Sequence, residues 1–492
     1  MSQNTQCSDQ MMMNFFKRTQ VIDTSKIPQI EDLKNQNLKE LKIITLNLSG
    51  KTIYHENFVD VCKIISQCQN LTTLCLNLKS ANIASEGASR LGESISFCQQ
   101  LLILNLDLSY NNIDVKGSLN LVQGLSKCLQ LQSLSLNFDS NKINNSAAIK
   151  FCEYINQCQN LENLDIEMNY IKNQDEQGDQ DIQIQISCPK LLYLKLSLQF
   201  SDFMLSKLAE ALSQSSQLSK LVLILVKNNF SDLGMTLLGD QIAYCQSLTE
   251  LNLNLRESKL GDEGFIKLTQ GIAKCQNLKS LNLDCFHTQI TQKYSKTFID
   301  KLSQIVYLSS FVLNFGSTKI GNGFLVKFGE TLPKLKRLNK FNLCLNDSSI
   351  AFSQATLKEF GEGLENSQSL KQFDLDISGY VVGAEEMQYL CKGISNSKSL
   401  TNFSLRLVRC QIDQQSLKYF GNCIVQCTNL ISFQVNLIAN EVSDESKIEL
   451  GKQISKCQHL LCCYLFFGFV SNIKLINALK CLKLVKFGPF LR

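Results

Sequence analysis

A leucine recurs about every 30 residues along most of this chain, and this period constrains the fold more than any other feature. The repeated unit begins at Leu41, Leu71, Leu101, Leu131, Leu161, Leu191, Leu218, Leu248, Leu278, Leu308, Leu338, Leu370, Leu400, Leu430 and Leu460. Twelve of the fourteen intervals are 30 residues long, and the other two are 27 and 32. A period of this size is the signature of a solenoid of stacked supersecondary units. We therefore expect one repeat array rather than the about three domains that a length of 492 residues suggests.

Each repeat changes its apolar period midway. In the second repeat, leucines alternate with small or polar residues at Leu74, Leu76 and Leu78. This is the period of a strand with one buried face. A second stripe follows at intervals of 4, 4 and 3, through Gly87, Leu91, Ile95 and Cys98. Those intervals are typical of an amphipathic helix. Strand, turn and helix in regular succession predict a parallel sheet with all its helices on one side.

The repeats share the pattern LxxLxLxLxxNxI, as in LLILNLDLSYNNI from Leu101 and LQSLSLNFDSNKI from Leu131. This pattern resembles the leucine-rich repeat of the ribonuclease-inhibitor class, with two extra strand residues in each unit. It is similar to a 30-residue variant abundant in ciliate proteins. The resemblance implies an α/β horseshoe of about 15 repeats, with the parallel sheet on the concave face and the helices on the convex face. Proteins of this family mostly bind other proteins.

The expected organisation has three parts: an N-terminal tail and cap over residues 1–37, the solenoid over 38–470, and a C-terminal cap over 471–492. Strands lie about 4.8 Å apart whereas packed helices need about 8–10 Å, so such an array bends toward its strands. Caps are expected because a terminal repeat has a neighbour on one side only.

Two rows of outward strand positions are expected to line the concave face. Four residues after each leucine stand Thr45, Cys75, Asn105, Ser135, Asp165, Lys195, Val222, Asn252, Asn282, Val312, Asn342, Asp374, Ser404, Gln434 and Tyr464. Six residues after it stand Asn47, Asn77, Asp107, Asn137, Glu167, Ser197, Ile224, Asn254, Asp284, Asn314, Cys344, Asp376, Arg406, Asn436 and Phe466. The polar majority is either a solubilising ladder or a docking strip for a partner, and the sequence leaves both open.

Departures from this polar ladder are the candidate partner-binding residues. The apolar pair Val222 and Ile224 and the aromatic pair Tyr464 and Phe466 are of the kinds that form interface hot spots, although a C-terminal cap would also cover the second pair. The acidic pairs are Asp165 with Glu167, and Asp374 with Asp376. They would select a basic partner, unless they are simply solvated. The acidic stretch 173–181 breaks the fifth repeat, and is either a functional insertion or a degenerate solvated loop.

The residues that usually carry catalysis or metal binding do not form a site in this pattern. Cysteine precedes nine of the fifteen leucines by three residues, but Leu335 and Ile305 occupy the same slot, so we interpret the column as packing rather than as metal ligands. The three histidines, His55, His287 and His459, lie in repeats far apart. We expect no enzyme activity, no cofactor and no metal site.

A net charge of +5 over 492 residues gives no reason to expect nucleic-acid or membrane binding. No secretory signal is recognised near the N-terminus, and the longest apolar run, residues 460–470, is too short to span a bilayer. We therefore expect a cytoplasmic monomer whose 21 cysteines are thiols.

The leading hypothesis is a non-catalytic scaffold that binds a partner protein on its concave face. Two alternatives remain. One is a GTPase-activating protein of the Ran type, a class that shares this repeat. The other is a structural component of a large assembly, for example a ciliary one. The sequence does not identify the partner.

Overall fold

The computed structural model describes residues 38–53, 55–169, 188–199, 201–346, 353–457 and 460–467. The chain divides into two compact units. Unit 1 comprises Met1–Gln199 and Glu210–Leu218, and unit 2 comprises Phe200–Ala209 and Ser219–Arg492. The expected caps, 1–37 and 471–492, and the acidic stretch 173–181 lie outside the described residues.

The described residues form one open sheet of fifteen strands, ordered β1 to β15 as in the sequence. Within each unit, neighbouring strands are parallel, and equivalent positions of successive repeats lie opposite each other, such as Leu74 and Leu104. The strands are β1 (Ile43–Asn47), β2 (Thr73–Asn77), β3 (Ile103–Asp107), β4 (Ser133–Asn137), β5 (Asn163–Met168), β6 (Tyr193–Leu198), β7 (Lys220–Ile224), β8 (Glu250–Asn254), β9 (Ser280–Asp284), β10 (Ser310–Asn314), β11 (Lys340–Cys344), β12 (Gln372–Asp376), β13 (Asn402–Arg406), β14 (Ser432–Asn436) and β15 (Cys462–Phe466). The predicted parallel sheet is confirmed.

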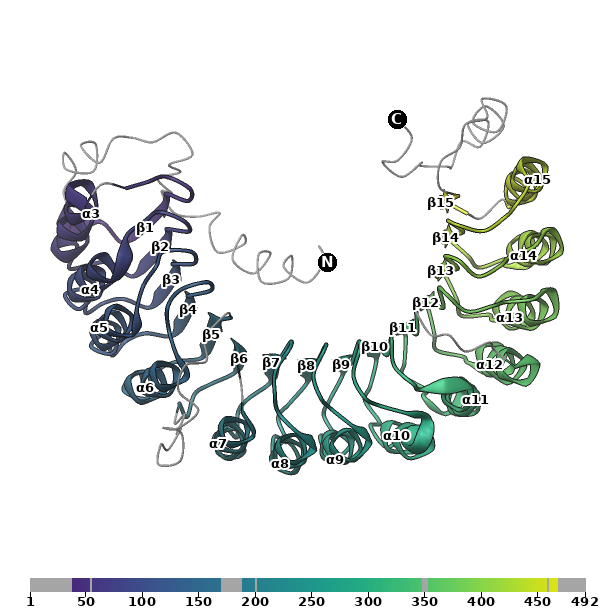
Figure 1. Ribbon diagram of the computed structural model, residues 1–492, viewed down its shortest axis with the longest axis horizontal. Coiled ribbons are helices and arrows are strands. Elements are labelled where there is room, and N and C mark those ends of the chain that lie inside the picture. The colour runs from purple at the N-terminus through teal and green to yellow at the C-terminus, as the bar shows by residue number, and fades with distance from the viewer. Residues whose placement is uncertain are drawn as a thin grey trace. The chain divides into compact units, whose positions relative to one another are not determined.

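Helices connect most of these strands, and within each unit they all lie on one side of the sheet (Figure 1). They are α3 (His55–Gln67), α4 (Ala84–Ile95), α5 (Val115–Leu125), α6 (Asn145–Ile155), α7 (Asp202–Ser213), α8 (Asp232–Ile242), α9 (Asp262–Ile272), α10 (Ser295–Leu302), α11 (Gly321–Thr331), α12 (Gln354–Asn366), α13 (Ala384–Asn396), α14 (Gln414–Gln426) and α15 (Asp444–Ile454). The described residues also form three short 3-10 helices, η2 (Leu38–Glu40), η4 (Gln292–Tyr294) and η5 (Leu332–Lys334). The expected repeating α/β solenoid architecture is therefore present in the described residues.

The core lies between the strands and the helices. Alternate strand residues point into it, so that Leu74 and Leu76 of β2 are buried, as are the helix-stripe residues Leu91 and Ile95 of α4. In unit 2 phenylalanine replaces leucine at one inward position of five successive strands, Phe311, Phe341, Phe373, Phe403 and Phe433. Neighbouring rings of this ladder stack with centroids 5.6–6.1 Å apart. Offset stacking adds to the stabilisation that burial of the rings provides.

A buried asparagine closes the turn after several strands. The Asn111 amide oxygen accepts hydrogen bonds from the backbone of Ala81 and Ile83 in the preceding repeat, at 3.0 and 3.3 Å. Its nitrogen donates to the carbonyls of Leu78 and Leu108 at 2.7 and 3.0 Å. Asn141 and Asn440 make the equivalent bonds, each to the backbone of its own repeat and of the preceding repeat. One side chain thus bonds backbone groups of two repeats, including the Ile83 N–H, which has no other partner among the described residues.

The cysteine column lies where the helices lead back to the strands. Cys98 and Cys128 are fully buried, and each thiol donates to a carbonyl of the preceding repeat, Ile65 and Ile95 respectively, at 3.4 Å. Burial raises the pKa of both thiols to about 12. These positions therefore act as small buried packing groups with a weak inter-repeat hydrogen bond.

Candidate functional site

The surface that the helices leave uncovered is the opposite face of the sheet, here called the open face. Its side chains are those of the two rows of outward strand positions predicted from the sequence, and nearly all of them are half-buried. Because parallel strands place equivalent residues side by side, each row runs across the strands from repeat to repeat.

The asparagines and aspartates of the second row have a structural role that the sequence analysis missed. Each of the nine accepts a hydrogen bond, at 2.9–3.3 Å, from the backbone nitrogen two residues further on, as Asp107 does from Ser109. This is an Asx turn, which ends the strand. The sequence signal that could have identified these turns is an Asn or Asp at the last position of a strand. The Asn and Asp residues of the second row therefore have a structural role that does not require a partner. The positions of this row that hold other residues are the better candidates for partner binding.

The first row differs, because its asparagines are not used in this way. Asn105, Asn252, Asn282 and Asn342 make no side-chain hydrogen bond with any described residue. All four are half-buried on the open face. Their amides are available as both donors and acceptors to a molecule that lies on this face.

The acidic pair Asp165 and Glu167 on β5 is already paired with a cation. The ammonium of Lys195 on β6 lies 3.2 Å from Asp165 and also bonds Glu167. Burial raises the pKa of Asp165 to about 6, opposed by the Lys195 charge. Burial alone would lower the pKa of Lys195. The two neighbouring carboxylates raise it by more, so the pKa lies above the usual lysine value. A basic partner would have to compete with Lys195 here.

The second acidic pair, Asp374 and Asp376 on β12, is also engaged. Asp374 accepts from the Gln372 amide at 3.0 Å, and burial raises its pKa. Asp376 accepts from the Ser378 hydroxyl at 2.6 Å and lies 3.6 Å from the Arg406 guanidinium of β13. Both carboxylates are therefore engaged by neighbouring groups of the chain, and the Asp376–Arg406 contact joins β12 to β13.

The apolar pair on β7 is split by the structure. Val222 is only 8% exposed and offers little surface to a partner, whereas Ile224 is half-buried on the open face. Ile224 also stands where other repeats place the Asx-turn residue, so this strand has exchanged a structural aspartate or asparagine for an aliphatic side chain. Val226, two residues further on, is half-buried too and was not among the predicted residues.

Two further residues join Ile224 and Val226 at the ends of the next strands. The Arg256 guanidinium lies 4.3 Å from the centroid of the Phe286 ring and 3.3 Å from the Asp284 carboxylate. The backbone places these positions side by side, because Lys227 donates to the Arg256 carbonyl and Glu257 to that of Phe286. We call Ile224, Val226, Arg256 and Phe286 the β7–β9 cluster. It combines aliphatic, aromatic and arginine side chains, the types that dominate binding energy at interfaces.

The aromatic pair Tyr464 and Phe466 lies on β15, where both side chains are half-buried. Their register partners on β14 are Gln434 and Asn436. The structure does not bring this pair near the β7–β9 cluster within unit 2, since five strands, β10 to β14, lie between the two in the sheet.

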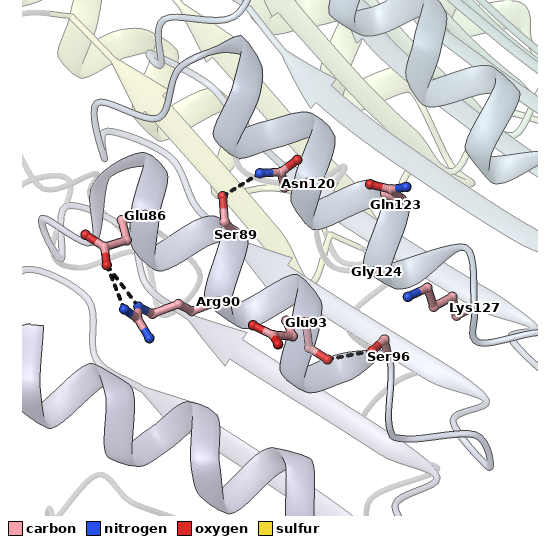
Figure 2. A pocket seen from close by; sticks show the side chains of 9 residues that line it. All are labelled: Glu86, Ser89, Arg90, Glu93, Ser96, Asn120, Gln123, Gly124 and Lys127. Atoms are coloured by element: carbon pink, nitrogen blue, oxygen red, sulfur yellow. Dashed lines mark hydrogen bonds and ion pairs between the residues drawn. The ribbon is translucent and has the colours of Figure 1, made fainter.

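A hollow of about 480 Å³ lies on the helix side of unit 1, between α4 and α5 (Figure 2). Its lining is polar, and several of its groups bond one another. Arg90 pairs with Glu86 at 2.8 Å, and the Asn120 amide donates to the Ser89 hydroxyl at 3.1 Å. It contains no histidine or cysteine, so it has the character of a hydrated surface trough rather than that of a reaction centre.

Among the described residues, no group of three or more His, Cys, Asp or Glu side chains is placed to hold a metal ion. In the same part of the chain, none of the helices has the length and apolar content required to cross a membrane. Comparison with known proteins gives no family: no protein-family model matches the chain, and no curated protein matches it.

Proposed function

We propose that this protein is a non-catalytic scaffold that binds a partner protein on the open face of its sheet. The β7–β9 cluster carries this proposal. At this place the second row of the open face holds Ile224 where most strands end in an Asx residue, and Val226 and the stacked Arg256–Phe286 pair lie beside it. The neighbouring amides of Asn252 and Asn282 supply polar groups beside it.

A rigid array suits this function, because its surface is formed before the partner arrives and little entropy is lost on docking. We further propose that the repeats are leucine-rich repeats of the ribonuclease-inhibitor class. The LxxLxL core and the buried Asn111 that bonds two repeats support this assignment. A reducing compartment such as the cytoplasm fits the nineteen described cysteines, each of which is free.

The proposal is tested by affinity capture from the native cell with quantitative mass spectrometry, comparing the natural sequence with Ile224→Asp. A charge at the centre of the cluster should weaken capture of the partner by about tenfold or more, because a hot-spot side chain contributes at least about 1–2 kcal/mol. The melting temperature should stay close to that of the natural protein, because Ile224 is only half-buried.

Leu233→Asp is the matched control. Leu233 is an exposed aliphatic residue of α8, on the helix side of the same unit. It should leave capture unchanged. If a protein were captured equally by Ile224→Asp and lost with Leu233→Asp, binding would belong to the helices and the proposal would be wrong.

A further inference from the structure

The side of the sheet on which the strands begin carries an unusual concentration of positive charge in unit 2. Five successive connections lead from a helix to the start of a strand, residues 273–279, 303–309, 332–339, 367–371 and 397–401. Together they contain seven cationic residues and no carboxylate: Lys274, Lys279, Lys334, Lys336, Arg337, Lys371 and Lys398. All seven are exposed. We call this set the basic edge.

The basic edge is continuous in space, because all five connections enter parallel strands at the same side of the sheet. The backbone joins them in sequence. Ser309 donates to the Lys279 carbonyl, Asn339 to Ser309, Lys371 to Asn339 and Thr401 to Lys371, at 2.8–2.9 Å. Four steps of about 4.8 Å give an edge about 19 Å long.

No side chain of the basic edge forms an ion pair with a described residue. The Arg337 guanidinium instead lies over the Tyr307 ring, 4.4 Å from its centroid. The acidic residue nearest to these connections in the sequence, Glu365, lies in the last turn of α12 and accepts a hydrogen bond from the Asn396 amide.

Helix stabilisation does not account for the basic edge. Cations are favoured at helix C-termini because of the helix dipole, but that preference acts on every helix of the array. In the same unit, the corresponding connections 243–249 and 427–431 contain no charged residue, and 455–461 contains one cation, Lys456. The charge is therefore concentrated between β9 and β13, where four of the five connections carry it.

We propose that the basic edge binds an acidic segment of a polypeptide in extended conformation. About six residues of such a segment span 19 Å, so a short run of Asp or Glu can face all five connections. Single-stranded nucleic acid is less well matched, because it requires several aromatic platforms. Tyr307 is the one aromatic residue in these connections, and Arg337 already covers a face of its ring. A membrane surface is less well matched as well, since the exposed apolar residues here are only Val306 and Tyr307.

The proposal is tested with the full chain and a fluorescein-labelled peptide of about ten glutamates, by fluorescence anisotropy at about 50 and 200 mM KCl. The protein should bind the peptide and release it as salt rises. The triple variant Lys279→Ser, Lys336→Ser and Lys371→Ser should bind about tenfold more weakly or worse.

The matched control removes the same charge from the opposite edge of the strands in unit 2, by Lys259→Ser, Lys296→Ser and Lys319→Ser. These three lysines are exposed as well. The control should change the affinity by less than about twofold. Equal losses in both triple variants, or no binding by the natural chain at 50 mM KCl, would overturn the proposal. So would tighter binding of a single-stranded RNA of equal charge, or of phosphatidylserine vesicles. This test is independent of the Ile224→Asp variant, so the two proposals can fail separately.

Discussion

At the scale of single residues, two asparagines of the third repeat have opposite environments. Asn111 is fully buried and makes five hydrogen bonds to the backbone of two repeats. Asn105 lies six residues earlier on the open face, and its side chain makes no hydrogen bond with a described residue. The same residue type is therefore structural in one place and available for binding in the other.

Asn111→Ala should lower the free energy of unfolding by about 2–4 kcal/mol. The substitution removes five hydrogen bonds, each contributing about 0.5–1.5 kcal/mol net, and leaves the Ile83 N–H without a partner among the described residues. The carbonyls of Leu78 and Leu108 keep other donors, so the loss falls below the upper end of that sum. The measurement is urea denaturation followed by circular dichroism. Asn105→Ala is the control and should change stability by less than about 0.5 kcal/mol. Equal effects of the two substitutions would mean that the ladder of buried asparagines does not stabilise the repeats.

Residue types alone were not enough to identify the candidate site. The sequence located the outward rows correctly, because strand alternation is a strong signal. It did not show that the second row ends strands, because an Asx turn and a solvent-exposed amide look alike as letters. It also missed Val226, Arg256 and Phe286, which lie beyond the predicted rows and are brought together only by the pairing of neighbouring strands.

At the scale of elements, glycines determine how closely several helices approach. A methyl group on Gly271 of α9 would fall on the carbonyl of Gly239 in α8, and one on Gly239 would lie 2.6 Å from the Leu268 Cα. Gly124 and Gly92 make the same arrangement between α5 and α4. These positions belong to the helix faces that the apolar stripes predicted, but close approach of two backbones is not visible in a single sequence.

Gly271→Ala should destabilise the protein by about 1–3 kcal/mol, because the two helices must separate or bend to accept the methyl group. The control is Gly323→Ala in α11. There an added Cβ meets nothing within 4 Å, so alanine should stabilise the helix by about 0.5–1 kcal/mol. Thermal melting of both variants gives the comparison. A stabilised Gly271→Ala variant would contradict the close contact.

The turns after the strands also escaped prediction. Most described repeats place a residue in the left-handed region there, including Ser80, Tyr110, Lys227, Glu257 and His287, with φ between 53° and 60°. Glycine occupies this turn position at Gly50 and Gly379. Since the usual glycine signal is mostly missing, the conformation is imposed by the strand pairing before the turn and by the helix after it.

At the scale of the whole molecule, most of the architecture follows from one repeated signal. Fifteen copies of the same pattern reinforce one another, so the parallel sheet and the helices on one side of it could be predicted from the repeat leucines and the apolar stripes. Properties that differ between copies were not predictable in this way. The phenylalanine ladder of β10–β14 and the basic edge arise only when the repeats are aligned in space.

A repeat array also opens locally, because each repeat contacts only its neighbours and the stability is nearly a sum of local terms. Buried cysteines report such opening. Cys98 and Cys128 adjoin the repeat of Asn111 in unit 1, whereas Cys275 and Cys410 belong to unit 2, and all four are fully buried. Burial raises the pKa of each to about 12, so the closed state should react with iodoacetamide very slowly.

Asn111→Ala should therefore accelerate alkylation of Cys98 and Cys128 by at least about thirtyfold, which corresponds to about 2 kcal/mol less opening free energy. The rates at Cys275 and Cys410 should not change. Timed iodoacetamide labelling at constant pH, followed by peptide mass spectrometry, measures all four sites in one sample, with the denatured chain as the reference for complete reaction. Equal acceleration at all four cysteines would contradict local opening, because it would mean that the repeats open together in one cooperative transition.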